Sequence, residues 1–190
     1  ISGSWDLTIV TAALSRFAEN AISGAVRWLL RNAARRGDLD LPDTQHPETG
    51  SGLVVLGMGK LGANELNYSS DVDLIVLYDE EAVPYIGKKS AQDCFIRIIR
   101  ELVKMLQQPT RDGYVLRTDL RLRPDPGVTP VVVSMSAAEQ YYESLGQNWE
   151  RAAMIKARPV AGDLVAGASF LERMQPFIWR RNLDYAAIAD

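Results

Sequence analysis

The chain has 190 residues, of which 47% are hydrophobic and 24% are charged, and its net charge is −3. These values are typical of a globular protein with one well-buried core, and the slight excess of acids argues against nucleic-acid binding over a basic face. The single cysteine and single histidine exclude an internal disulfide and a zinc site built from such residues. No apolar run is long enough to span a membrane and no signal peptide is visible, so we expect a cytoplasmic protein without a membrane partner.

The first part of the chain predicts a long helix, a loop and a short buried strand. Apolar residues recur at three- and four-residue spacing over residues 5–35, which indicates a helix. Residues 38–51 are polar and punctuated by proline and glycine, as in a loop. Residues 53–56 are all aliphatic and predict a strand. A tight turn over residues 57–62 and a brief helical turn over residues 63–66 are expected next.

The remainder predicts two further strands and several helices. Strands are expected over residues 71–78 and 114–123, with a strongly amphipathic helix over residues 88–107 between them. The last three expected elements are helices, at residues 136–145, 149–155 and 169–181. The pattern indicates an α+β fold, in which a small mixed sheet carries the functional acids and helices flank it before and after.

Three parts are expected along the chain. Residues 1–50 would form an N-terminal helix and a linker packed on the core, residues 51–135 the catalytic core, and residues 136–190 a C-terminal helical segment. Because the chain starts at Ile1 rather than at methionine and ends in a helical-looking stretch, we expect it to be a piece of a longer protein.

Asp71 and Asp73 are the most informative pair of residues in the sequence. They precede the aliphatic part of the expected strand, and side chains two residues apart on a strand point to the same face. Two carboxylates held that close repel each other unless a cation lies between them. The simplest reason for such a pair is a hard divalent metal, usually Mg²⁺, which takes oxygen ligands and phosphate partners.

Asp119 is the best candidate for the third carboxylate that a two-metal site requires. If residues 114–123 form one strand, Arg117, Asp119, Arg121 and Arg123 share a face. An acid flanked by arginines fits a site for metal and phosphate. The alternative is ordinary salt bridging on a solvated face.

The stretch over residues 57–62 reads Gly-Met-Gly-Lys-Leu-Gly and matches a dinucleotide-binding pattern. Only eight residues separate Gly62 from Asp71, too few for the crossover helix that a dinucleotide fold needs. We therefore favour a turn whose backbone N–H groups approach phosphate oxygens, with a lysine adding charge. The expected nucleotide- or phosphate-binding residues are Gly59, Lys60, Ser69, Ser70, Arg121, Arg123 and Lys156.

Several stretches carry a resemblance to known families. The twelve-residue spacing from Gly59 to Asp71 resembles the nucleotidyltransferase (DNA polymerase β-like) superfamily. Residues 57–74, 119–124 and 149–160 resemble the glutamine synthetase adenylyltransferase/adenylyl-removing enzymes. That family carries two homologous halves, and the Gly-Met-Gly-Lys-Leu-Gly turn and the Trp-Glu-Arg motif of this chain resemble the amino-terminal, adenylyl-removing half.

The resemblance implies a multifunctional, ATP-binding enzyme of nitrogen regulation, whose removing half takes AMP from a tyrosine of glutamine synthetase by phosphorolysis and releases ADP. It implies Asp71, Asp73 and Asp119 as catalytic residues and ligands of two Mg²⁺ ions, with phosphate as co-substrate. Glutamine synthetase is the implied partner, and the PII signal protein would act through parts of the longer chain. Two alternatives stay open: adenylyl transfer from ATP to glutamine synthetase, and a non-catalytic nucleotide-sensing module.

Overall fold

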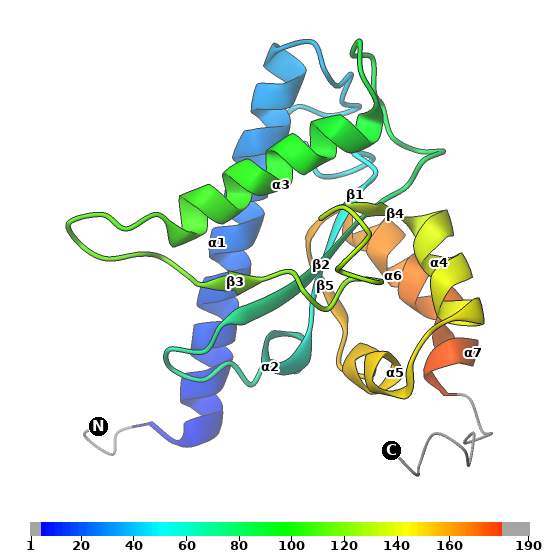
Figure 1. Cartoon of the computed structure of the whole chain (residues 1–190). Helices are drawn as coiled ribbons and strands as arrows, with labels where there is room; N and C mark the ends of the chain where they lie inside the picture. The colour runs from blue at the N-terminus through cyan, green and yellow to red at the C-terminus, as the bar shows by residue number, and fades with distance from the viewer. Residues whose placement is uncertain (1–4, 180–190) are drawn as a thin grey trace.

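The computed structural model describes residues 5–179 and consists of one sheet with helices on both faces (Figure 1). In chain order the elements are α1 Leu7–Arg35, β1 Leu53–Gly57, α2 Gly59–Gly62, β2 Val72–Tyr78, α3 Ala91–Gln107, β3 Thr118–Asp119, β4 Val133–Ser134, α4 Met135–Ser144, α5 Asn148–Met154, β5 Arg158–Gly162, α6 Leu164–Arg173 and α7 Gln175–Ile178. The expected α+β fold is confirmed. None of the helices within this part of the chain has both the length and the apolar character needed to cross a membrane.

The sheet is mixed in direction. Its strand order is β3-β2-β1-β5, and β4 also pairs with β2. Strand β1 runs antiparallel to both β2 and β5, whereas β3 and β4 run parallel to β2. A dinucleotide-binding unit would need parallel strands on either side of the glycine-rich turn. The antiparallel pairing of β1 with β2 therefore excludes the dinucleotide reading of that turn.

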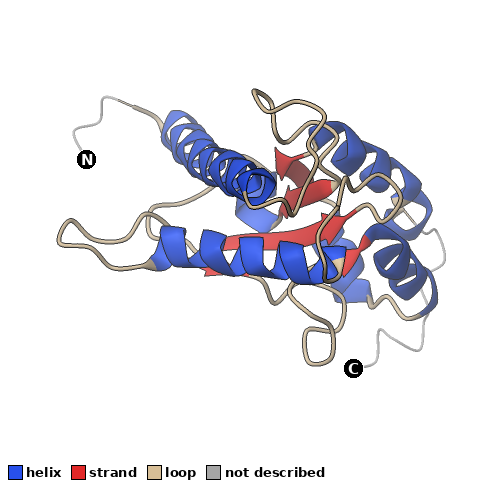
Figure 2. Cartoon of the chain, turned by 90° about the horizontal axis from the view of Figure 1, so that it is seen from above, coloured by secondary structure: helices blue, strands red, loops and turns tan. Residues whose placement is uncertain are grey.

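Helices surround the strands of the sheet (Figure 2), and a hydrophobic cluster lies on each of its two faces. On β2, Val72, Leu74 and Val76 pack with residues of α1 and α3. Ile75 and Leu77 face the opposite side and pack with residues of α4 to α7. Because side chains alternate along a strand, Asp73 points to the same side as Ile75 and Leu77.

Helix α1 is tied to the loop that precedes the acids. It begins after Asp6, whose carboxylate accepts a hydrogen bond from the N–H of Ile9 at 2.8 Å. The buried hydroxyl of Ser15 accepts a hydrogen bond from the backbone N–H of Leu66 at 3.0 Å, across 51 residues of sequence. These contacts fix where the chain enters the segment that leads to β2.

The expected strand over residues 114–123 was wrong in length, because only Thr118–Asp119 pairs with the sheet. The carboxylate of Asp119 accepts a hydrogen bond from the N–H of Arg121 at 2.8 Å, which turns the chain away from the sheet. The side chain of Arg123 donates to three loop carbonyls instead of lying on a shared strand face. Such local bonds between side chain and backbone compete with a strand ladder.

Other boundaries also differ from the sequence expectation. The helical turn lies at Gly59–Gly62, within the glycine-rich stretch, rather than at residues 63–66. Strands β4 and β5 were not expected, and β5 contains a proline, which is tolerated because β5 is an edge strand. The helix expected over residues 169–181 is two helices, α6 and α7, and its residues 180–181 lie outside the described part.

Candidate active site at the start of β2

The three predicted acids come from two neighbouring strands. Asp71 immediately precedes β2, Asp73 is the second residue of β2, and Asp119 ends β3. The parallel pairing of β2 with β3 places Asp73 directly opposite Asp119. Burial raises the pKa of Asp73 most, and the negative charges of Asp119 and Asp71 raise it further, so the three carboxylates interact electrostatically.

The glycine-rich turn lies against this cluster. The N–H of Met58 donates to the backbone carbonyl of Asp73 at 2.9 Å, which joins the end of β1 to the start of β2. Gly59 has a φ of +50°, and a Cβ placed on it would lie 3.3 Å from Asp73 Oδ2. Glycine permits both the left-handed conformation and this close approach. The positive charge of Lys60, the next residue, offsets a small part of the rise in the pKa of Asp73.

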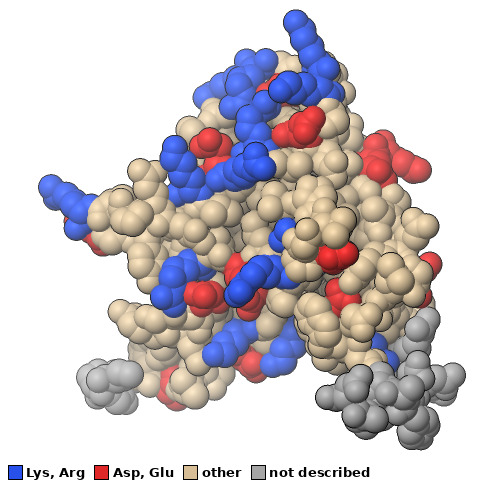
Figure 3. Space-filling model, viewed as in Figure 1, with Lys and Arg blue, Asp and Glu red and all other residues tan. Residues whose placement is uncertain are grey.

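Two arginines hold two of the three acids. Arg117 Nε donates to Asp71 Oδ1 at 2.6 Å, and its second terminal nitrogen donates to the carbonyl of Ser69. Arg121 Nε lies 3.0 and 2.9 Å from the two carboxylate oxygens of Asp119. Acidic and basic side chains are accordingly interleaved on the face that carries β2 and β3 (Figure 3).

Asp73 differs from its neighbours in having no such partner among the described residues. Burial raises its pKa most, followed by the charges of Asp119 and Asp71. The pKa of Asp119 is lowered instead, chiefly by its hydrogen bonds to the Arg121 side chain. Asp73 is therefore the carboxylate of the three without a direct ion pair among the described residues, and the charges of Arg121 and Lys60 offset only part of the rise in its pKa.

The donor set suits a hard divalent cation, because carboxylate oxygens are its preferred ligands and a cation would relieve the repulsion at Asp73. Within residues 5–179, however, no three acidic, histidine or cysteine side chains are arranged to hold a metal ion. In the structure Asp71 is paired with Arg117 and Asp119 with Arg121. Binding of Mg²⁺ by the three acids stays a prediction.

The remaining predicted residues lie in different surroundings. Ser69 and Ser70 lie directly before the acids, beside Arg117. Arg123 is used within its own loop, as described above. Lys156 pairs with Glu65 at 3.0 Å, and both side chains are more than half exposed. Arg117 is the site residue that the sequence did not single out, because its contact with Asp71 depends on pairing between distant segments.

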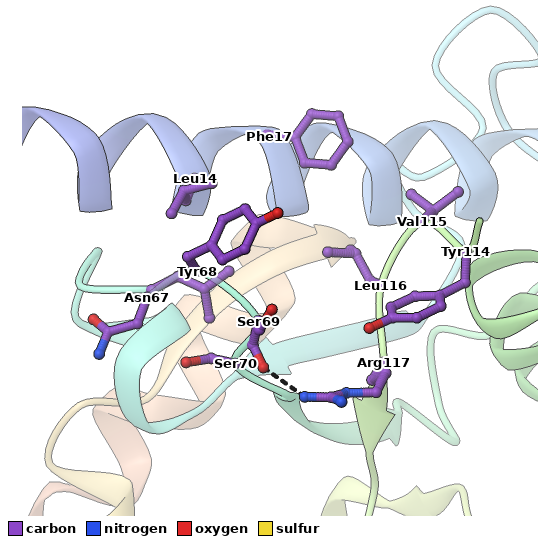
Figure 4. Close-up of a pocket in the computed structure, with 11 residues that line it drawn as sticks. Leu14, Phe17, Asn67, Tyr68, Ser69, Ser70, Tyr114, Val115, Leu116 and Arg117 are labelled. Atoms are coloured by element: carbon purple, nitrogen blue, oxygen red, sulfur yellow. Dashed lines mark hydrogen bonds between the residues drawn. The ribbon is translucent and has the colours of Figure 1, made fainter. Parts of the chain in front are cut away.

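A cavity of about 300 Å³ lies beside Ser69, Ser70 and Arg117 (Figure 4), and none of the three acids is among its lining residues. Its walls come from α1, the segment before β2 and the segment before β3. Its lining residues are Leu14, Phe17, Leu66, Asn67, Tyr68, Ser69, Ser70, Tyr114, Val115, Leu116 and Arg117. Several large side chains around it, including Phe17 and Tyr68, are exposed rather than used in the core. The cavity size is at the lower end of the range for small-molecule sites.

We expect the substitutions Asp73→Asn and Asp119→Asn to change stability in opposite directions at neutral pH. A raised pKa in the folded state means that the native protein binds more protons than the unfolded chain, so Asp73 destabilises the fold as pH rises above its unfolded value. The lowered pKa of Asp119 has the reverse effect, contributing stability that is lost as pH falls through the folded pKa.

Urea unfolding at pH 7 should therefore show a higher midpoint for Asp73→Asn and a lower midpoint for Asp119→Asn than for the unmodified protein. The gain for Asp73→Asn should shrink toward pH 4, where the carboxyl group becomes protonated. Equal losses of stability in both variants would contradict the assignment of Asp73 as the unpaired carboxylate and Asp119 as the paired one.

Comparisons with known proteins cover nearly the whole chain. The sequence model of the family described as glutamate-ammonia ligase adenylyltransferase matches residues 1–173. Proteins named bifunctional glutamine synthetase adenylyltransferase/adenylyl-removing enzyme are 54% identical in Mesorhizobium japonicum, 58% in Rhizobium meliloti and 55% in Xanthobacter autotrophicus. The matches cover 100%, 95% and 100% of this chain and 19%, 18% and 19% of those relatives. The chain thus spans about a fifth of the length of the curated relatives it matches.

Proposed function

This chain belongs to the glutamate-ammonia ligase adenylyltransferase family, and on that premise we propose that it removes AMP from an adenylylated tyrosine of glutamine synthetase by phosphorolysis. The observation that supports this most strongly is the cluster of Asp71, Asp73 and Asp119 at the start of two paired strands, against a glycine-rich turn. Such a cluster is suited to phosphoryl chemistry, in which catalysis rests on positioning and on compensation of charge.

In the proposed reaction, an oxygen of inorganic phosphate forms a bond to the phosphorus of tyrosyl-AMP. The bond between that phosphorus and the tyrosine oxygen breaks, and the electron pair stays on the tyrosine oxygen, which takes up the proton lost by hydrogen phosphate. The products are ADP and unmodified tyrosine, so atoms and charge balance. The attacking group is already an anion, so no general base with an unusual pKa is needed.

The residues of the chain have distinct roles in this proposal. Asp71, Asp73 and Asp119 would hold Mg²⁺, which supplies Lewis-acid compensation of the charge on phosphoryl oxygens. Gly59 allows the backbone to approach the reacting group, and Lys60 adds a positive charge beside Asp73. Arg121 pairs with Asp119 and, by lowering its pKa, keeps that carboxylate ionised. The partners of the whole protein, including glutamine synthetase and the PII signal protein, are part of the same proposal.

The second candidate function is adenylyl transfer from ATP to glutamine synthetase. The names of these relatives cover both directions, and the chain matches only about a fifth of each relative. The three acids would serve either direction, because the same phosphoryl group is transferred. The removing direction rests on the resemblance of residues 57–62 and of the Trp-Glu-Arg motif at residues 149–151 to the removing half.

One assay separates the two directions. The purified protein is supplied with adenylylated glutamine synthetase and phosphate in one reaction, and with unmodified glutamine synthetase and ATP in the other. We expect ADP release only in the first reaction, and only with Mg²⁺ present. AMP incorporation in the second reaction without ADP release in the first would instead assign adenylyl transfer.

A further inference from the structure

Arg117 lies between the acidic cluster and the neighbouring cavity. Its side chain is half exposed and bonds to Asp71. It also lines the cavity and donates to the carbonyl of Ser69 (Figure 4). The guanidinium is therefore the cationic group shared by the two features. A pocket wall with a guanidinium and several hydroxyl groups is suited to an oxyanion.

We propose that this cavity holds the attacking phosphate, bound by Arg117 once the guanidinium is released from Asp71. The inference rests on the proposed function, because it names where the co-substrate of that reaction sits. Besides Arg117, the lining contributes hydroxyl groups from Ser69, Ser70 and Tyr114. Figure 4 shows the hydroxyl end of Tyr114 pointing into the pocket rather than away from it.

The contact between Arg117 and Asp71 explains how phosphate binding is linked to the state of the acids. In the described structure Arg117 Nε lies 2.6 Å from Asp71 Oδ1, so the two charges neutralise each other. A divalent cation on Asp71 competes for the same carboxylate oxygens, which leaves the guanidinium free to bind phosphate in its two-pronged geometry. The pair is half exposed on both sides and hence weak, so the exchange of partners has a low cost.

The chemistry of the product gives the proposal a specific consequence. The phosphate that enters becomes the second phosphate of ADP, so the same subsite must hold inorganic phosphate before the reaction and the terminal phosphate of ADP after it. AMP has no group for this subsite. Arg117 should therefore contribute to binding of phosphate and of ADP, and not to binding of AMP.

The first test measures binding of inorganic phosphate, ADP and AMP in the presence of Mg²⁺, by phosphorus NMR titration and by calorimetry. We expect Arg117→Gln to weaken phosphate and ADP binding by about tenfold, as loss of a charge-assisted contact implies, and to leave AMP affinity within about twofold. Arg111→Gln is the matched control, because Arg111 is 92% exposed and does not line the cavity. It should change none of the three affinities.

The second test removes the carboxylate of Asp71, which competes with phosphate for Arg117, and keeps the guanidinium of Arg117. Asp71→Asn can no longer neutralise Arg117, so phosphate should bind in the absence of Mg²⁺ about tenfold more tightly than in the unmodified protein. The double variant Asp71→Asn/Arg117→Gln should lose this gain. If Arg117 were only a structural contact of Asp71, Asp71→Asn would loosen the segment before β2. Phosphate affinity would then not increase.

Equal weakening of AMP and ADP by Arg117→Gln, or unchanged phosphate binding in Asp71→Asn, would overturn the proposal. Melting temperatures of all variants establish that they fold, and Arg117→Lys, which keeps the charge, should retain part of the phosphate affinity. Failure of the proposed function has a different signature. The unmodified protein would then release no ADP from adenylylated glutamine synthetase, whereas the effect of Asp71→Asn on phosphate binding would remain measurable.

Discussion

Asp73→Asn is expected to lower the rate of phosphate-dependent ADP release from adenylylated glutamine synthetase by about three orders of magnitude. Asp73 is the carboxylate at the centre of the acidic cluster and has no cationic hydrogen-bond partner among the described residues. Its charge is therefore available for a metal ion, which would in turn offset the charge of the transferred phosphoryl group. Loss of about 4 kcal/mol of charge stabilisation in the transition state corresponds to this decrease in rate.

The matched control is Asp112→Asn, because Asp112 is 83% exposed and lies in a surface loop. It should leave the rate unchanged. Asp73→Asn should be at least as stable as the unmodified protein at pH 7. A loss of rate in this variant would therefore not be caused by unfolding. Near-normal turnover in Asp73→Asn would show that the acidic cluster is not where the chemistry takes place.

Gly62→Ala is expected to lower the free energy of unfolding by about 3 kcal/mol, the largest effect on stability that we anticipate for a single methyl group. A Cβ at this position would lie 1.9 Å from the carbonyl oxygen of Lys156 and 2.6 Å from that of Gly57. Both are backbone atoms, so the clash cannot be relieved by rotation of a side chain. Either α2 or the segment before β5 would have to move.

Gly24→Ala is the same substitution at a position where we expect it to increase stability. Gly24 lies in α1, and a Cβ added there would meet nothing within 4 Å. Alanine is favoured over glycine in a helix by about 0.5–1 kcal/mol, so this substitution should stabilise the protein. Chemical unfolding of both variants measures the difference, and a Gly62→Ala protein as stable as Gly24→Ala would show that α2 is not packed as described.

The long elements and the acids could be predicted from the sequence because their signals are local. The apolar spacing of residues 5–35 and the aliphatic run after Asp73 each repeat with the period of one regular element. The twelve-residue spacing from Gly59 to Asp71 likewise indicates a short connection between two strands. Helix α1 and strand β2 accordingly lie where they were expected.

The parts that could not be predicted depend on contacts between distant residues. Whether residues 114–123 continue as a strand is decided by Asp119 and Arg123, which bond to their own backbone segments. The proximity of Arg117 to Asp71 follows from the parallel pairing of β2 with β3, a feature that no local pattern encodes. Strand β5 was missed because a proline and a glycine in its sequence favour loops, and only its edge position accommodates them.

The attachment of α1 to the acid-bearing segment has an evolutionary consequence. Ser15 accepts a hydrogen bond from the N–H of Leu66, and Glu19 pairs with Arg158 of β5 at 3.0 Å, so one helix braces both sides of the acid-bearing segment. A recombination breakpoint in the loop over residues 38–51 would separate that segment from its brace and uncover one face of the sheet. The helix and the acids should therefore be inherited together, as one exchangeable unit, even where gene fusion or duplication rearranges the rest of the protein.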